Sequence, residues 1–162
     1  MAISQAMCTS FKVELLSGGH NFNTANVART VNTQDSFKIA LYTSSASLGA
    51  ATTAYTASGE TSGTGYSATG QALTISAVPQ ADGTTAILNF STETWTTASI
   101  TARGALIYND TMSDTAVAVL DFGGDKTSTA GDFSVVFPTF DATNAIIRKR
   151  NRGLLWLTQL FT

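Results

Sequence analysis

The sequence predicts an all-β protein, a single antiparallel β-sandwich or jelly-roll-like domain with extended N- and C-terminal segments. Short runs rich in β-branched and aromatic residues recur between turn signals, and no long helical pattern separates them. A length of 162 residues fits one domain whose core needs no disulfide or metal for stability. The 27 threonines, 16 serines and 23 alanines favour strands and predict a surface of low charge.

Residues 1–34 are expected to form an N-terminal arm, or a short helix followed by a loop. Apolar and charged side chains alternate from Phe11 to Leu15, which suits a strand, whereas the apolar pair 15–16 with two glycines behind it suits a short capped helix. Periodicity does not separate the two alternatives over residues 4–17. The stretch 18–34 is polar and indicates an extended arm or a long loop.

Residues 35–149 are expected to form the sandwich core. The run 36–43 places Phe37, Ile39 and Leu41 on one face of a strand. Further strands are predicted at 71–78, 85–90, 103–108, 116–122, 132–137 and 145–149. Proline and glycine in 79–83 predict a tight turn, so 71–78 and 85–90 should pair antiparallel. Glycines predict a mobile loop or turn region at 59–70, and 123–131 is expected to be a linker.

Charge is divided unevenly along the chain. The net charge is −2, but residues 1–147 carry −6 and residues 148–162 carry +4 with no acidic side chain. Such a body lacks the basic field that holds nucleic acid, so no nucleic-acid partner is expected. No stretch approaches the length of a membrane span, and the first residues lack a secretory pattern. The chain is therefore expected to fold in a cytoplasm, without a membrane partner.

No motif predicts catalysis. Residues 121–123 and 124–127 resemble fragments of kinase and phosphate-loop motifs, but Asp125 stands where the phosphate loop needs a glycine. The single His20 and the single Cys8 are interpreted as a loop histidine and a small buried side chain. Five aspartates lack calcium-loop spacing and are expected to cap turns: Asp110, Asp114, Asp121, Asp125 and Asp132. We therefore expect no enzyme and no cofactor.

The C-terminal segment, residues 150–162, is expected to be a basic and apolar strand or arm. Burial of its large apolar side chains does not by itself offset the entropy of ordering the segment, so we expect it to pair with a sheet edge. That edge belongs either to the same domain or to a neighbouring subunit. The candidate partner-contact residues are Arg148, Lys149, Arg150, Arg152, Trp156, Leu157 and Phe161.

Four segments of the sequence, taken together and in this order, resemble a known family. They read DSFKIALYTSSASLG at 35–49, TAYTASGETSGTGY at 53–66, ITARGALIYN at 100–109 and AVAVLDFGGDK at 116–126. Together they resemble a family of small structural proteins of tailed bacteriophages. The resemblance covers residues 35–148, and the basic and apolar extension after Arg148 departs from the pattern.

The resemblance implies a capsid cement or decoration protein on the exterior of the virion, assembled in the host bacterial cytoplasm. The implied partners are the major capsid protein and further copies of the chain itself, as a dimer or trimer. The alternative is a tail or head-fibre component that binds a receptor or a glycan. Tyr55 and Tyr66 in the loop 44–70 favour this alternative, because aromatic faces on a loop can stack on sugars.

Overall fold

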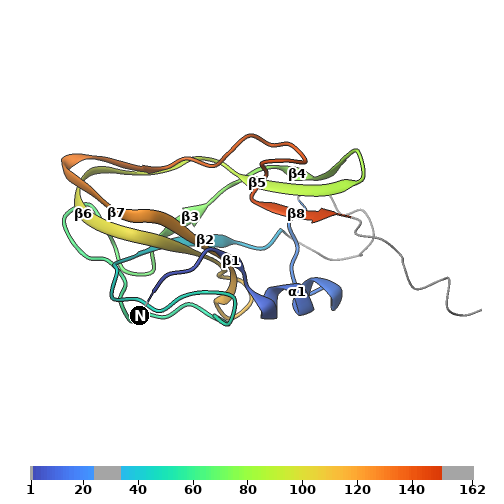
Figure 1. Ribbon diagram of the computed structural model, residues 1–162, viewed down its shortest axis with the longest axis horizontal. Helices are drawn as coiled ribbons and strands as arrows, with labels where there is room; N and C mark the ends of the chain where they lie inside the picture. The colour runs from blue at the N-terminus through green and yellow to red at the C-terminus, as the bar shows by residue number, and fades with distance from the viewer. Residues whose placement is uncertain (1, 24–33, 151–162) are drawn as a thin grey trace, which may run out of the picture.

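The computed structural model describes residues 2–23 and 34–150. These residues form two antiparallel sheets and the short helix α1 (Thr9–Leu16) (Figure 1). The five-stranded sheet has the order β1 (Ala6–Met7), β7 (Thr115–Val135), β6 (Glu93–Asn109), β2 (Phe37–Tyr42) and β3 (Gln71–Leu73). The three-stranded sheet has the order β4 (Ile75–Asp82), β5 (Thr85–Phe90) and β8 (Ile147–Arg150). The predicted antiparallel, mainly β class is confirmed at this level.

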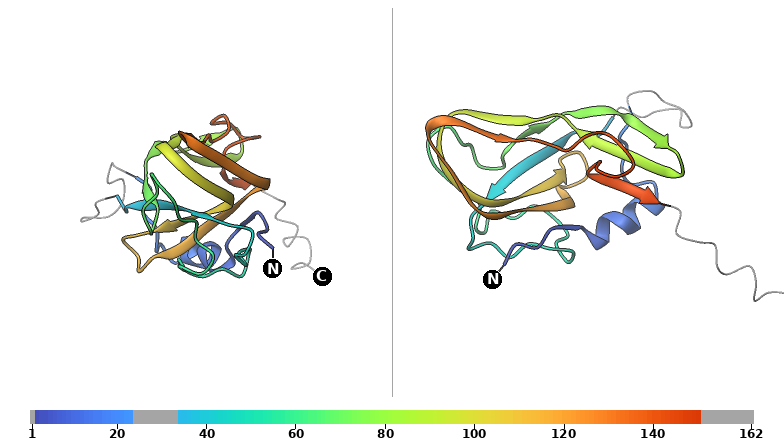
Figure 2. Two further views of the ribbon diagram at one scale, coloured as in Figure 1. Left: turned by 90° about the vertical axis from the view of Figure 1, so that its left-hand side faces the viewer. Right: turned by 45° about the horizontal axis from the view of Figure 1, so that its top comes forward.

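The hairpin of β6 and β7 is the longest feature of the fold. Its two strands have 17 and 21 residues, and their register shifts at several points. At one shift, residues 122–125 of β7 bulge out opposite Arg103. Bulges bend a strand pair and increase its twist, and the hairpin curls over at one end of the molecule (Figures 1 and 2). The predicted linker at 123–131 is therefore wrong, because a bulged strand continues through these residues.

The chain changes sheets between β3 and β4. The predicted strand 71–78 is divided, since its first part pairs with β2 and the rest pairs with β5. β4 continues through Pro79, and the turn consists only of Gly83 and Thr84. Proline is tolerated there because β4 is an edge strand whose register shifts beside it. The predicted pairing with β5 is confirmed, but the predicted turn at 79–83 is too long.

Residues 2–23 pack against the five-stranded sheet. Gly18 follows α1 at φ +72°, and its N–H donates to Leu15 O at 3.3 Å. A glycine in this conformation ends a helix at low steric cost, so the short helix is the correct one of the two alternatives. Four apolar side chains of this segment are buried: Ile3, Cys8, Phe11 and Phe22. This part of the predicted arm therefore belongs to the compact body, and residues 24–33 lie outside the described part of the chain.

The loop between β2 and β3 is packed closely onto the sheet. Tyr42 Oη donates to Thr56 O at 2.6 Å. Gly70 lies so close to β2 that an added Cβ would overlap the carbonyl oxygen of Ile39. The prediction that 59–70 forms no helix or strand is confirmed, apart from two isolated bridges. The glycines in this loop permit close backbone contact.

Replacement of Gly70 by alanine should lower the free energy of unfolding by at least about 2 kcal/mol. The residue has φ +72°, which L residues rarely adopt, and the new methyl group would displace the backbone of β2. Gly124→Ala is the matched control, since its Cβ would meet nothing within 4 Å. Urea unfolding measures both variants, and equal stabilities would contradict this close approach.

Candidate functional site

Strand β8 places three of the predicted contact residues on the outside of the molecule. β8 is the last strand of its sheet and pairs with β5 on one side. Its first residue, Ile147, is buried, whereas Arg148, Lys149 and Arg150 are exposed. Arg150 Nη2 also donates to Ala142 O at 3.0 Å. We call Arg148, Lys149 and Arg150 the β8 strip.

A groove of about 810 Å³ separates β8 from α1. Figure 1 shows these two elements close together at the right of the molecule. In α1, Leu15 is 40% exposed and Leu16 is 88% exposed. The lining consists of Met7, Lys12, Leu15, Leu16 and the four residues of β8. This α1–β8 groove therefore combines apolar side chains with four cations.

The groove brings together only part of the predicted contact set. The β8 strip lines it, together with the helix residues Lys12, Leu15 and Leu16, which were not among the predicted contact residues. Their i, i+3, i+4 spacing is typical of one helical face, but the same stretch also suited a strand. The other predicted contact residues lie outside the described part of the chain: Arg152, Trp156, Leu157 and Phe161.

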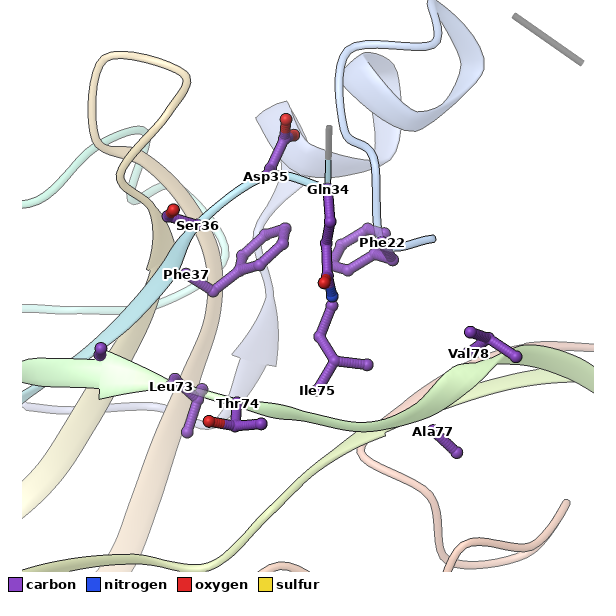
Figure 3. Close-up of a pocket in the computed structure, with 11 residues that line it drawn as sticks. Phe22, Gln34, Asp35, Ser36, Phe37, Leu73, Thr74, Ile75, Ala77 and Val78 are labelled. Carbon is purple, nitrogen blue, oxygen red and sulfur yellow. The ribbon is translucent and has the colours of Figure 1, made fainter. Parts of the chain in front are cut away.

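A second pocket, of about 490 Å³, lies beside the chain that leads into β2 (Figure 3). Phe22 and Phe37 stack in its lining, with ring centroids 4.6 Å apart. Asp35 supplies the carboxylate of this lining, but Figure 3 shows it turned away from the apolar side chains. Its Oδ2 accepts hydrogen bonds from Asn21 N at 2.8 Å and from Asn109 Nδ2 at 2.7 Å. The carboxylate therefore anchors the fold.

His20 lies in a polar network that joins α1 to the turn between β6 and β7. Its side chain is fully buried, with Nε2 2.6 Å from Glu14 Oε2 and Nδ1 2.9 Å from Asn109 Nδ2. Asn109 Oδ1 accepts the backbone N–H groups of Thr111 and Met112, so Nδ2 must face the imidazole. His20 therefore carries its proton on Nε2 and donates it to Glu14. The loop position was predicted, but the burial was not.

Cys8 is a buried structural residue. Its Sγ lies 4.0 Å from Gly49 O, and the side chain has no exposed surface. Burial, followed by the charge of Glu14, raises the pKa of the thiol to about 11. Little thiolate exists at neutral pH under these conditions. The prediction of a small buried cysteine is confirmed.

Two of the predicted turn-capping aspartates, Asp121 and Asp110, make structural contacts with neighbouring strands. Asp121 Oδ1 accepts from Gly123 N at 2.9 Å and faces Arg103 Nε at 3.4 Å, and these contacts hold the pKa of Asp121 below its usual range. Asp110 pairs with Lys38 Nζ at 2.8 Å.

Across residues 2–23 and 34–150, no three potential metal ligands of the His, Cys, Asp and Glu types lie together. In the same ranges no helix has the length and apolar character to cross a membrane.

Tyr55 and Tyr66, the predicted sugar-stacking residues, are engaged within the fold. Their hydroxyl groups donate to the two carboxylate oxygens of Glu60, each at 2.6 Å. The ring of Tyr55 packs 5.2 Å from that of Tyr108, and the ring of Tyr66 packs 6.0 Å from that of Trp95. These contacts attach the loop to the sheet, so the structure lends no support to sugar stacking by this pair.

Stability should fall in alkaline solution as the tyrosines ionise. Burial, and then the hydrogen bond to Glu60, raises the pKa of Tyr55 to about 12, and burial also raises the pKa values of Tyr42, Tyr66 and Tyr108. An unfolded tyrosine has a pKa of about 10. Because the pKa of each of these tyrosines is higher in the folded than in the unfolded chain, their contribution to the free energy of unfolding is complete below pH about 10. This contribution is lost as the pH rises towards 12 and above.

Tyrosinate absorbance and urea unfolding across this pH range measure the effect. Tyr55→Phe should flatten the dependence on pH, because it removes one raised pKa. An unfolding free energy that stays constant over the range would contradict the burial of these hydroxyl groups.

Comparison with known proteins does not extend these observations. No family model matches the sequence, and no match was found among curated proteins or among solved structures. The candidate site therefore rests on its own geometry.

Proposed function

We propose that this chain is a structural virion protein of a tailed bacteriophage, a capsid cement or decoration protein that binds and bridges major capsid subunits. In this proposal it lies on the capsid exterior after folding in the host cytoplasm. Its partners are the major capsid protein and further copies of itself, and it performs no catalysis. Its sandwich or jelly-roll-like domain would serve as a rigid body between neighbouring subunits.

The β8 strip beside the α1–β8 groove is the observation that carries the proposal. Residues 1–147 have a net charge of −6, whereas the strip gathers three exposed cations on one strand. Cations of this kind complement an acidic protein surface, and all three are exposed. The resemblance over residues 35–148 supplies the class of partner.

The low surface charge suits a protein present in many copies. Only 12% of the residues are charged, so neighbouring copies repel one another weakly. Each contact needs only modest strength, because symmetry repeats it around the shell.

Copy number in purified particles tests the proposal. Quantitative mass spectrometry of virions should find this chain in amounts comparable with the major capsid protein, on intact heads. A handful of copies per particle would favour the tail or head-fibre alternative. Absence from finished particles would contradict both assignments.

Reversal of the exposed charge should weaken capsid binding by at least about tenfold. The variant Arg148→Glu/Lys149→Glu removes two cations of the β8 strip but keeps Arg150, which also bonds Ala142. Lys126→Glu is the matched control, since Lys126 is an exposed cation on β7 outside the groove. Co-sedimentation with heads that lack the protein measures binding, and circular dichroism checks folding. Equal binding by both variants would remove the strip from the mechanism.

A further inference from the structure

The α1–β8 groove lies at an uncovered sheet edge. Within the described residues, β8 pairs with β5 alone, so its other edge presents unpaired backbone groups. Exposed strand edges are ready templates for another strand. On the opposite side of the groove, Leu15 and Leu16 expose large apolar side chains. An apolar strand laid along β8 would cover both features together.

We infer that residues 154–157 of the same chain form this strand, pairing antiparallel with β8 and filling the α1–β8 groove. The three-stranded sheet then gains a fourth strand, in the order β4, β5, β8 and 154–157. This inference concerns the fold of the chain itself and does not rest on the proposed function.

The connection between β8 and this segment has the length and composition of a hairpin loop. β8 ends at Arg150, which itself lines the groove. Three residues follow, Asn151, Arg152 and Gly153, before the apolar run begins at Leu154. Three-residue hairpin loops commonly end on a left-handed residue, the position where glycine is favoured. Gly153 stands at that position.

The composition of the segment fits the walls of the groove. Residues 154–157 read Leu-Leu-Trp-Leu, so an extended strand would present apolar side chains on both faces. From Gly153 to Thr162 the sequence contains no charged side chain, so the segment adds no repulsion to Lys12 and the β8 strip. A basic segment would be repelled by the same cations.

The covalent connection favours the chain's own segment over that of a second copy. A three-residue loop holds the segment beside the groove at high effective concentration. Pairing within the chain requires no second molecule and closes only a short loop, which has a low entropic cost.

Fluorescence of Trp156 tests the inference in the full-length chain. Trp95→Phe leaves Trp156 as the only tryptophan, and its emission should be blue-shifted and protected from a soluble quencher. Leu16→Asn should abolish both effects, because Leu16 lines the groove. Val13→Asn is the matched control, since Val13 is 60% exposed on the same helix but lies outside the groove lining. Solvent-exposed emission in the parent, or shielding that survives Leu16→Asn, would overturn the inference.

Hydrogen exchange on the unmodified chain provides an independent measurement. Alternate amide groups within residues 154–157, those that face β8, should be protected, and Leu16→Asn should remove their protection while that of β6 and β7 persists. Rapid exchange at every residue from 154 to 157 in the unmodified chain would overturn the inference even if Trp95→Phe failed to fold.

A mixing experiment distinguishes the chain's own segment from that of a second copy. The chain carrying Trp95→Phe and Leu16→Asn is refolded together with a full-length chain that has an intact groove. In this second chain, Trp95→Phe removes the other reporter, and Leu155→Asn, Trp156→Asn and Leu157→Asn disable its own segment. Both chains are kept at low micromolar concentration, far below the effective concentration of a segment held by a short loop. Pairing that depends on this tether predicts no recovery of the shielded emission, whereas recovery would show that a second copy binds without the tether and would overturn the inference.

Discussion

Replacement of Trp95 by alanine should lower the free energy of unfolding by about 3–5 kcal/mol, the range observed for large aromatic side chains in cores. Trp95 has no exposed surface and packs against Tyr66 and Phe133, with ring centroids at 6.0 and 6.2 Å. With the Gln71 amide oriented to satisfy its neighbours, its oxygen accepts from Trp95 Nε1 at 3.3 Å. Alanine would leave a cavity where β6, β7 and the loop before β3 meet.

Denaturant unfolding measures this loss through the midpoint, with the slope checked for unchanged two-state behaviour. Trp95→Phe is the control, because it keeps an aromatic ring between Tyr66 and Phe133 and should cost much less. A loss below about 1 kcal/mol for the alanine variant would contradict full burial of this side chain.

The change Asn109→Ala should destabilise the protein by about 3 kcal/mol, because several buried polar groups lose their partners at once. Asn109 is fully buried and bonds four groups. Its Nδ2 contacts His20 and Asp35, and its Oδ1 accepts from the backbone of Thr111 and Met112. Alanine satisfies none of these groups.

Asn144→Ala is the matched control for this network. Asn144 Nδ2 also donates to an aspartate, Asp141, at 2.9 and 3.0 Å, but Asn144 is exposed and water can replace it. Asn144→Ala should therefore lower the free energy of unfolding by no more than about 1 kcal/mol. Thermal unfolding of the two variants at one pH makes the comparison, and equal losses would show that burial of the Asn109 network adds nothing.

Local sequence patterns predicted the strands that are marked by alternation or by β-branched content within the strand itself. Alternation around Ile39 and the β-branched run in 116–122 placed β2 and the first part of β7 correctly. The glycines at 123 and 124 suggested a linker, yet the strand continues, because the partner strand β6 tolerates a bulge opposite Arg103. No short window contains that partner, so no local signal separates a bulged strand from a loop.

Only one part of the candidate site could be predicted from the sequence, for a similar reason. The cations at 148–150 stand out by composition alone. The groove beside them also needs α1, which is more than 130 positions away in sequence. In the same way His20 looked like a loop residue, whereas Glu14 and Asn109 bury it from two separate parts of the chain.

The amino-acid sequence alone determined the mainly β class, the short helix as one of two alternatives, and the basic run that begins at Arg148. Composition and periodicity are properties of neighbouring residues, and these features depend on little else. Only the tertiary structure decided that α1 lies across a groove from β8, that β7 passes through its glycines as a bulged strand, and that His20 is buried. Each of these features depends on contacts between segments that are distant in sequence. These contacts form, and stabilise the structure, only when the chain folds.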